Sequence, residues 1–504
     1  MNYAAIKAQA DGLATLNAKI ASGARYEYVN IDEGWWASGE RDPRGDFVID
    51  EKQWPGGMPA IARYIHGKGL KAGIYIDSGP QGCGQRANGS HYVGSDYAHY
   101  DHDFLQFARW GFDFVKVDFC GGLHAGYDPQ DAYRRIAQSI QNAGLHTGQY
   151  LTFSICDAGY RPPDASFPDR NEGPWTWGAG VGAMWRTTDD IYGPGSGAPD
   201  FRRVTGNLKG NYHPQSQHTG YYNDPDMMVA GMGMSAENDR AHMSLWAISG
   251  APLILGNDLS KPLADSTVRL LTNVEIIAID QDGLGVQGLL VNEAAGRQVW
   301  AKLLTGTGRR AVALFNNTAN AAPMSVTWQQ LGLAVSSQAR VRDVWAHEDL
   351  GRFAGAFTAQ AVPAGGVVML EIQGVDLAAQ DWVEAPSTET NGAPCPSCVK
   401  VAFNAAVANE GGAFIQIAYI NAGNLTGKMH FSMNGAQATT VALPPTRANG
   451  GAGTVVVYAW LQAGQNSLAI TGEGNSNPVP VIRGITTVAG PVAQPGFDAS
   501  HKAS

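Results

Sequence analysis

The sequence has little cysteine, little charge and no long apolar run. Its 504 residues include 5 cysteines, too few for a disulfide-stapled scaffold. No apolar stretch is long enough to span a bilayer, so we expect no membrane as a partner. Acidic residues outnumber basic ones, 45 to 35, and the net charge of -10 disfavours nucleic acid as a partner and suits a neutral substrate. The chain is 44% hydrophobic, which predicts two or three folded domains at this length.

The N-terminal residues show no signal peptide, because residues 1–21 have the pattern of an amphipathic helix. Other features favour secretion: few lysines, abundant glycine, and Asn-x-Ser/Thr triplets at Asn88, Asn316 and Asn424. We therefore expect a secreted, extracellular protein whose signal peptide is not present in this chain.

Seven apolar segments, each ending in polar residues and followed by a loop or a helical stretch, occupy the first half of the chain. This alternation predicts a (β/α)8 TIM barrel over residues 1–282. Strands are expected at 26–32, 70–77, 112–118, 151–156, 183–190, 221–224 and 252–258, and helices at 58–66, 97–110, 128–142 and 236–248. Because the chain opens in a helix, we expect the first barrel strand to be absent from it.

Short alternating strands without helices follow the barrel. Those at 298–303, 310–316, 324–328, 340–345 and 366–372 predict an antiparallel β-sandwich over residues 283–375. Residues 376–398 have the composition of a linker. Strands at 413–421, 428–434, 439–443 and 454–461 predict a second β-sandwich over 399–490, with a carbohydrate-binding role left open, and 491–504 is expected to be a disordered tail.

The stretch around which the chain is organised is the apolar segment 112–118, which Gly121 and Gly122 follow. Lys116 and Asp118 are two residues apart, so their side chains leave the same face of the expected strand. A carboxylate and an ammonium at the C-terminal end of a buried parallel strand are typical of an active site. The alternative is that Asp118 only caps the next helix.

Nearly every expected strand ends in a carboxylate or another hydrogen-bonding group. The carboxylates include Asp32, Glu33, Asp77, Asp118, Asp157, Asp189, Asp190, Asp224 and Asp226. A barrel gathers its strand ends on one face, so these groups are expected to converge. Many carboxylates with few basic residues favour polyol recognition, and glycoside hydrolysis needs two of them. A magnesium site is the rival chemistry, with only the number of carboxylates in its favour.

Five ordered motifs make the chain resemble glycoside hydrolase family 27, the α-galactosidase family, over about residues 4–372. The motifs are Tyr28-Val29-Asn30-Ile31-Asp32-Glu33-Gly34-Trp35, Gly73-Ile74-Tyr75-Ile76-Asp77-Ser78-Gly79, Lys116-Val117-Asp118-Phe119-Cys120, Trp185-Arg186-Thr187-Thr188-Asp189-Asp190-Ile191 and Asn223-Asp224-Pro225-Asp226-Met227. The resemblance implies a retaining double displacement on a (β/α)8 barrel followed by a β-sandwich.

The resemblance also implies a role for each matching residue. Asp118 corresponds to the nucleophile, and Asp190, rather than its neighbour Asp189, to the general acid/base. The sugar-binding residues would be Lys116 at the 3- and 4-hydroxyls, Arg186 and Asp157 at the 2-hydroxyl, and Asp32, Glu33, Tyr75, Asp226 and Met227 around the rest of the pocket. Lys116 is expected to lower the pKa of Asp118, which must stay ionised as a nucleophile. No cofactor and no metal are expected.

Glu33 departs from the family pattern. Most α-galactosidases have two aspartates followed by cysteine where this chain has Asp32-Glu33-Gly34. The extra methylene extends the carboxylate by roughly 1.2–1.5 Å, which would crowd the hydroxymethyl group of a hexose. A β-L-arabinopyranoside has the configuration of an α-D-galactoside without that group, so Glu33 favours a pentopyranoside substrate. The alternative is that the backbone shifts and galactose still fits. Asp157 also replaces the family's usual glutamate.

The resemblance pairs Cys83 with Cys120 in a disulfide and leaves Cys156 without a partner, because its usual mate position is Ala183. In the last domain Phe414, Tyr419, Tyr458 and Trp460 are candidates for stacking on sugar rings, with core packing as the better interpretation.

The sequence therefore predicts a retaining exo-glycosidase acting on terminal α-D-galactosides or β-L-arabinopyranosides of an oligosaccharide or polysaccharide. The alternatives are an isomaltose-releasing dextranase of the same family and a non-catalytic carbohydrate-binding protein. The oligomeric state stays open.

Overall fold

The structure is a computed structural model. It describes residues 1–21, 23–36, 41–85, 89–157, 173–193, 197–217, 219–377, 380–384, 400–408, 410–423, 427–436, 439–443, 445–446, 453–472 and 480–487. The chain divides into two compact units, of which the first comprises 1–174, 181–189 and 256–274, and the second 175–180, 190–255 and 275–504. Among the described residues, no helix combines the length and the hydropathy needed to cross a membrane.

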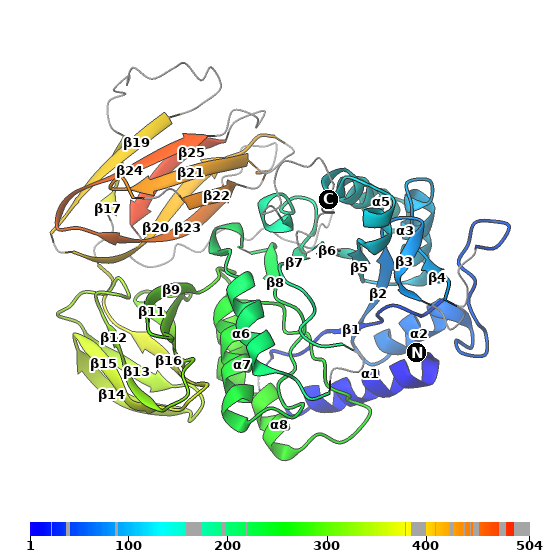
Figure 1. The fold of residues 1–504 in the computed structure, drawn as a ribbon, viewed down its shortest axis with the longest axis horizontal. Helices are drawn as coiled ribbons and strands as arrows, with labels where there is room; N and C mark the ends of the chain where they lie inside the picture. The colour runs from blue at the N-terminus through cyan, green and yellow to red at the C-terminus, as the bar shows by residue number, and fades with distance from the viewer. Residues whose placement is uncertain are drawn as a thin grey trace. The chain divides into compact units, whose positions relative to one another are not determined.

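The first unit is a parallel sheet with helices between its strands (Figure 1). Its strands are β1 (Tyr28–Asn30), β2 (Lys71–Asp77), β5 (Phe114–Asp118), β6 (Thr152–Cys156) and β7 (Met184–Arg186), paired in chain order, with the hairpin β3 (Gln81–Gln85) and β4 (His91–Val93) inserted after β2. Its helices are α1 (Tyr3–Asn17), α2 (Gly57–His66), α3 (Tyr100–Trp110), α4 (Cys120–His124), α5 (Pro129–Thr147) and α8 (Asp265–Leu271).

Helix α5 shows how local sequence sets these elements. Asp128 caps it by accepting a hydrogen bond from the N–H of Asp131 at 2.8 Å, and Pro129 occupies the first turn, where a missing N–H costs nothing. Gly148 ends the helix with φ 76°, a conformation that favours glycine. The helix is therefore longer at its C-terminal end than the 128–142 predicted, because Gly144 stays within the helix, where its missing side chain leaves room for the Tyr150 ring.

The second unit holds helices and a strand that follow β7 in the chain, together with the β-sandwiches. It holds α6 (Phe201–Gly210), η2 (Pro214–Ser216), β8 (Tyr222–Asp224) and α7 (Ala236–Ser249). Two further elements have their first residue in the first unit and the rest in the second, namely η1 (Pro174–Thr176) and α9 (Val274–Asp280). The fold is thus the predicted class, a (β/α)8 barrel followed by two antiparallel β-sandwiches.

The predicted strand at 252–258 is wrong. This segment is described throughout, and it forms only an isolated bridge between Met228 and Leu255, where the N–H of Met228 donates to Ile254 O at 2.7 Å. Pro252 has no N–H to give to a ladder, and the N–H of Ile254 turns back to Pro252 O at 3.0 Å. An apolar run alone did not reveal this turn.

The first sandwich pairs a six-stranded sheet, in the order β14-β13-β16-β11-β10-β9, with the two-stranded sheet β12-β15. Its strands are β9 (Leu289–Ala294), β10 (Arg297–Leu303), β11 (Arg309–Asn316), β12 (Ala322–Thr327), β13 (Gln338–Asp343), β14 (Glu348–Ala354), β15 (Ala356–Val362) and β16 (Gly366–Gln373). All five predicted strands are present. The prediction missed β9, β14 and β15; the largely exposed β14, for example, lacks an apolar alternation to signal it.

The second sandwich packs the sheet β17-β25-β20-β23 on the sheet β18-β19-β24-β21-β22 around one core. Its strands are β17 (Gln380–Asp381), β18 (Val383–Glu384), β19 (Lys400–Val407), β20 (Gly411–Ile420), β21 (Gly427–Met433), β22 (Thr439–Leu443), β23 (Gly453–Leu461), β24 (Gly464–Gly472) and β25 (Val481–Thr487). The predicted tail and most of the predicted linker lie outside the described residues.

Three of the four aromatic candidates in the second sandwich are packed inside the protein. Tyr419 is in the core, and Phe414 belongs to the core of the first sandwich, with Tyr458 packed against that core. The hydroxyl of Tyr458 donates to Gln330 O at 3.2 Å. Trp460 is 43% exposed. Core packing is therefore the correct interpretation for Phe414 and Tyr419.

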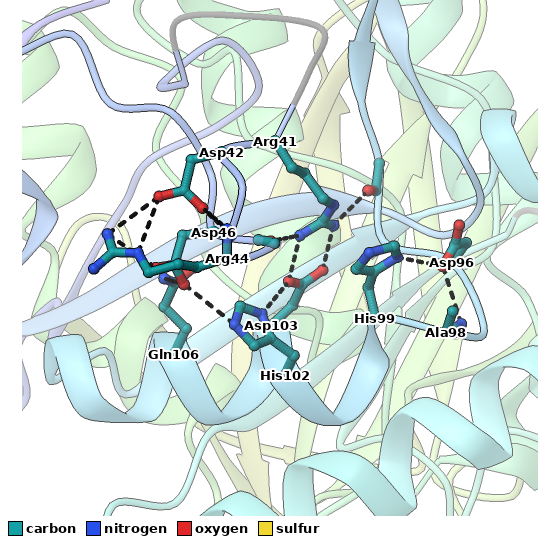
Figure 2. Close-up of polar contacts among 12 residues, drawn as sticks. Arg41, Asp42, Arg44, Asp46, Asp96, Ala98, His99, His102, Asp103 and Gln106 are labelled. Atoms are coloured by element: carbon teal, nitrogen blue, oxygen red, sulfur yellow. Dashed lines mark hydrogen bonds and ion pairs between the residues drawn. The ribbon is translucent and has the colours of Figure 1, made fainter.

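A buried ion pair fixes the segment that follows β1 onto α3 (Figure 2). Arg41 donates to both carboxylate oxygens of Asp103, at 2.7 and 2.6 Å, and to the carbonyls of Gly45 and Gly94. The side chain of Asp103 is 0% exposed and that of Arg41 10%. His102 lies 3.2 Å from Asp103 and 3.2 Å from Asp46, which extends the network along α3.

We predict that Arg41→Met lowers the free energy of unfolding by about 3–5 kcal/mol, because it leaves the carboxylate of Asp103 buried without a counter-charge. Urea unfolding followed by tryptophan fluorescence measures this. Arg44→Met is the matched control, since the side chain of Arg44 in the same segment is 80% exposed and its loss is expected to cost no more than about 0.5 kcal/mol. Equal effects of the two substitutions would contradict the prediction.

Helix α7 carries a buried histidine, His242, that predicts a pH dependence. Its side chain is fully buried, and neither ring nitrogen has a hydrogen-bond partner among the described residues. Burial lowers the pKa of His242 to about 3. The folded state therefore keeps His242 neutral, whereas the unfolded state binds a proton below pH ~6.5, so stability is lost as the pH falls through that value.

We predict that His242 alone removes about 2.5 kcal/mol of stability between pH 7 and pH 4.5. His242→Phe, which keeps a ring in the cavity, is expected to show a pH dependence of unfolding smaller by that amount. Urea unfolding at both pH values tests it, with exposed His146 replaced by Phe as the control. A variant with the same pH dependence as the wild type would show that His242 is not buried as a neutral group.

Candidate active site

The register between β2, β5 and β6 places the site residues on two successive levels. Tyr75 pairs with Lys116, and two residues further along Asp77 pairs with Asp118. On the other side of β5, Asp118 pairs with Cys156. Side chains two residues apart on a strand share a face, so Lys116 and Asp118 leave the same side of β5, as predicted.

Both carboxylate oxygens of Asp118 accept hydrogen bonds. The hydroxyl of Tyr75 donates to Oδ2 at 3.0 Å, and the N–H of Phe119 donates to Oδ1 at 2.9 Å. Burial raises the pKa of Tyr75 well above its ordinary value, and the charge of Asp118 adds to the effect. Tyr75 therefore keeps its proton, and its O–H orients the carboxylate of Asp118.

Lys116 makes its ion pair with Asp32. Its Nζ lies 3.3 Å from Oδ2 of Asp32 and 5.2 Å from the centre of the Tyr75 ring. Burial alone would lower the pKa of Lys116, but the charges of Cys156, Asp32 and Asp118 outweigh it and raise that pKa above its ordinary value. Lys116 is consequently a permanent ammonium beside the carboxylates.

Glu33 faces the β3 strand. The N–H of Gly84 donates to its Oε1 at 2.8 Å. Burial raises the pKa of Glu33, and the charges of Asp118 and Asp32 add to the rise, while the hydrogen bond from Gly84 opposes it. Glu33 thus lies within electrostatic reach of Asp118.

Asp77 has a structural role. Its carboxylate accepts hydrogen bonds from the N–H groups of Gly121, at 2.6 Å, and Cys120, at 3.1 Å, at the start of α4. Burial raises its pKa well above the ordinary range, with the charge of Asp118 adding to the rise. Asp77 therefore satisfies N–H groups at the start of α4, a capping contact that the sequence analysis considered only for Asp118.

The predicted disulfide between Cys83 and Cys120 is present. Ligand atoms of Asp77, Cys83, Asp118 and Cys120 lie within 4.8 Å of one another, a spacing that would suit a metal ion. Because the two sulfurs are bonded to each other, they are not thiolates, and this group lacks the soft ligands that a zinc site of such composition needs. Within the described part of the chain, Cys156 forms no disulfide.

Aromatic residues that the sequence interpretation did not single out support Tyr75. Trp36 stacks on the Tyr75 ring at 6.4 Å with an interplanar angle of 14°, and the indole N–H of Trp35 donates to Tyr75 O at 2.7 Å. Trp35 also contacts Phe47, over which the guanidinium of Arg41 lies at 4.4 Å. The Gly34-Trp35-Trp36 run directly after β1 is the signal that could have revealed them.

Arg186 and Asp157 are buried at the ends of β7 and β6. The Nη1 atom of Arg186 lies 3.9 Å from the sulfur of Cys156, and Nη2 donates to Thr188 O at 3.0 Å. The positive charge of Arg186 acts on Lys116, which places both near the end of the sheet. Asp157 follows Cys156 directly.

Three predicted site residues belong to the second unit. Asp226, at φ 83°, accepts a hydrogen bond from the N–H of Ile191 at 2.8 Å. The backbone carbonyl of Asp190 accepts a hydrogen bond from the guanidinium of Arg203 at 2.9 Å. Asp190 is an exposed residue. Asp226 therefore fixes the backbone just after Asp190, and Met227 is partly buried beside Asp226.

The contacts join five predicted residues of the first unit directly or electrostatically: Asp32, Glu33, Tyr75, Lys116 and Asp118. A carboxylate held by two hydrogen bonds at a strand end, an ammonium and further carboxylates on a (β/α)8 barrel define a site of the glycoside hydrolase class.

Comparisons with known proteins agree with this class. A sequence profile described as "Alpha galactosidase A" matches residues 8–282. Profiles for the "Alpha galactosidase C-terminal beta sandwich domain" and the "Alpha-galactosidase, CBM13 domain" match residues 294–372 and 400–481.

Among curated relatives, a probable alpha-galactosidase of Dictyostelium discoideum is 38% identical over 370 residues, covering 71% of this chain and 86% of that protein. An alpha-galactosidase of Oryza sativa subsp. japonica is 36% identical over 365 residues, covering 72% of this chain and 79% of that protein. Among solved structures, alpha-galactosidase I from Mortierella vinacea superposes with a TM-score of 0.62 at 27% identity, covering 74% of this chain and 93% of that one.

The chain belongs to glycoside hydrolase family 27, the α-galactosidase family, and it is a glycoside hydrolase. The resemblance drawn from the five sequence motifs is confirmed at the level of the family and of the enzyme class. These matches do not favour a non-catalytic carbohydrate-binding protein.

We predict that Tyr75→Phe lowers kcat/KM on an aryl glycoside by roughly 10- to 100-fold, because it removes one hydrogen bond to the Asp118 carboxyl group, a bond of about 1.5–3 kcal/mol. The ring and its stacking on Trp36 are retained, so circular dichroism is expected to be unchanged. Tyr26→Phe is the matched control, since the Tyr26 hydroxyl donates to Leu271 O, away from Asp118. Unaltered kinetics in Tyr75→Phe would remove Tyr75 from the site.

Proposed function

We propose that the protein is a retaining exo-glycosidase that releases terminal α-D-galactose or β-L-arabinopyranose, with Glu33 favouring the pentose. The observation that carries this proposal is the Asp118 carboxylate, held by Tyr75 and the Phe119 N–H at the end of β5. Relatives that are 38% and 36% identical carry the name alpha-galactosidase, which supports an α-galactoside-type substrate, with an oligosaccharide or polysaccharide as its source.

In the proposed double displacement, Asp118 attacks the anomeric carbon and forms a covalent glycosyl ester while the glycosidic C–O bond breaks. Asp190 gives its proton to the departing oxygen. In the second step Asp190 takes a proton from water, the water oxygen bonds to the anomeric carbon, and the ester to Asp118 breaks. Atoms balance over the cycle, and the anomeric configuration is retained.

The remaining residues bind the sugar in this proposal. Lys116, kept as an ammonium, contacts the 3- and 4-hydroxyls, and Arg186 and Asp157 hold the 2-hydroxyl. Asp32, Glu33, Tyr75, Asp226 and Met227 complete the pocket. Hydrogen bonds from Tyr75 and Phe119 keep the Asp118 lone pairs in a fixed direction, which saves reorganisation at the moment of attack.

The pentose preference rests on chain length. Where most family members carry aspartate, Glu33 extends the carboxylate by roughly 1.2–1.5 Å. β-L-Arabinopyranose offers the same ring hydroxyls as α-D-galactose without the hydroxymethyl group, so it tolerates the longer side chain. An isomaltose-releasing dextranase is not favoured, because the matching relatives carry α-galactosidase names.

Secretion is part of the same proposal. A disulfide such as Cys83–Cys120 persists in oxidising compartments, which supports an extracellular location.

We predict that Glu33→Asp shifts the ratio of kcat/KM for an aryl α-D-galactopyranoside over an aryl β-L-arabinopyranoside toward the galactoside. The expected shift is roughly 10- to 100-fold, since one methylene in a sugar pocket alters discrimination by about 1–3 kcal/mol. The measurement is steady-state release of the aryl group from both substrates by the wild type and the variant.

Two controls accompany this experiment. Glu27→Asp shortens an exposed glutamate just before β1 and is expected to leave the ratio unchanged. Asp118→Asn sets the background rate, since an enzyme without its nucleophile binds sugar but does not turn it over. A wild type that prefers the galactoside, with no shift in Glu33→Asp, would disprove the role given to Glu33. Retention of full activity in Asp118→Asn would disprove the mechanism.

A further inference from the structure

Two glycines of β3 face the carboxylate of Glu33. A Cβ on Gly84 would lie 2.5 Å from Oε2 and 3.0 Å from Cδ of Glu33, and a Cβ on Gly82 would lie 2.6 Å from Oε1. Real Cβ atoms do not approach an oxygen so closely, so any side chain at either position would displace the carboxylate. The Glu33 carboxylate lies in the space that these side chains would take, where its Oε1 accepts a hydrogen bond from the N–H of Gly84 at 2.8 Å.

The backbone of β3 does not itself require glycine at these positions. Both residues lie outside the set of glycines with positive φ, which includes Gly79 and Gly89 on either side of the strand. Around Gly82, the next atom that a Cβ would meet, Cβ of Tyr92, is at 3.4 Å, an ordinary contact. The space left by the two missing side chains is therefore explained by Glu33.

The glycines are also fixed with respect to the nucleophile. They flank Cys83, whose disulfide partner Cys120 follows Asp118 by two residues. The carbonyl of Gly82 lies 3.1 Å from Nδ1 of His91 on β4, which ties the hairpin together. A group held by β3 is thus held at a set position relative to the Asp118 strand end.

We infer that Gly82 and Gly84 are positioning residues for substrate selection: they form a socket that accepts the longer side chain of Glu33 and fixes its carboxylate. An aspartate at position 33 would end roughly 1.2–1.5 Å short, so the 2.8 Å hydrogen bond from Gly84 would open. The socket and the extra methylene of Glu33 therefore belong together. This inference rests on the proposed function, in which Glu33 lines the sugar pocket.

The chemistry of the contact makes the inference testable without unfolding the protein. The atoms that a new Cβ would meet are the far end of a flexible side chain, which can rotate away at little cost in stability. Gly84→Ala is therefore expected to fold and to keep its melting temperature within a few degrees, while it pushes the Glu33 carboxylate off its hydrogen bond.

The experiment measures KM and kcat of Gly84→Ala in two backgrounds, the wild type and Glu33→Asp, on whichever of the two aryl glycosides the enzyme turns over. We expect Gly84→Ala to raise KM about tenfold in the wild-type background, because the Glu33 carboxylate loses the fixed position from which it lines the sugar pocket. In the Glu33→Asp background the same substitution is expected to change KM less than twofold, because the shorter side chain leaves room for the methyl group.

Gly82→Ala repeats the test from the other side of the carboxylate and replaces Gly84→Ala if that variant does not fold. Gly206→Ala is the control, because a Cβ there meets nothing within 4 Å. Equal effects of the glycine substitutions in both backgrounds would overturn the inference, and so would the absence of any effect in the wild-type background.

The two experiments separate the role of the glycines in holding Glu33 from the role of Glu33 in the pentose preference. If Glu33→Asp leaves the ratio of the two glycosides unchanged, the pentose preference is wrong, yet the dependence of the Gly84→Ala effect on Glu33 still decides whether the socket exists. If the ratio shifts but that dependence is absent, Glu33 selects the substrate without the help of the glycines.

Discussion

The register of β2 against β5 is the constraint on which the site depends. Because Tyr75 lies opposite Lys116 and Asp77 opposite Asp118, one strand supplies a neutral donor and a cap, while the other supplies the ammonium and the carboxylate. A slip of one residue would turn Asp118 to the other face of the sheet and separate it from the Tyr75 hydroxyl. Such a slip would also move the polar side chains of Lys116 and Asp118 into the buried places of Val115 and Val117, so core packing fixes the geometry of the polar groups.

The polar groups at the strand ends differ in how deeply they are buried and in which groups they contact. Asp77 is fully buried and satisfied by the N–H groups of α4, so it shapes the loop that carries Cys120 rather than meeting substrate. Asp32, by contrast, is 61% exposed in its side chain and pairs with Lys116. Two aspartates at neighbouring strand ends thus differ in burial: Asp77 is held by the N–H groups at the start of α4, whereas Asp32 accepts a hydrogen bond from the adjacent N–H of Glu33 at 2.7 Å and stays exposed.

Sequence reasoning could predict whatever depends on pattern and spacing. Apolar runs located the strands that end at Asp77 and Asp118, and five motifs identified the family. The run at 252–258 misled because a strand also needs N–H groups to pair, and Pro252 has none. Asp77 and Asp118 both end buried strands, so periodicity could not tell that it is Asp77 that accepts the N–H groups of Cys120 and Gly121 at the start of α4. That distinction depends on the hydrogen bonds that only the folded chain shows.

The socket around Glu33 shows a further limit of reading residues one at a time. A glutamate in place of aspartate is visible in the sequence, but its consequence depends on Gly82 and Gly84, some fifty residues away, and on what those residues lack. Had β3 carried alanine, the longer carboxylate could not lie where it does, and position 33 would act on substrate from another place. In the proposed function, specificity would therefore be a property of a side chain and of the space opposite it, and the Cys83–Cys120 disulfide joins β3 to the segment that follows Asp118.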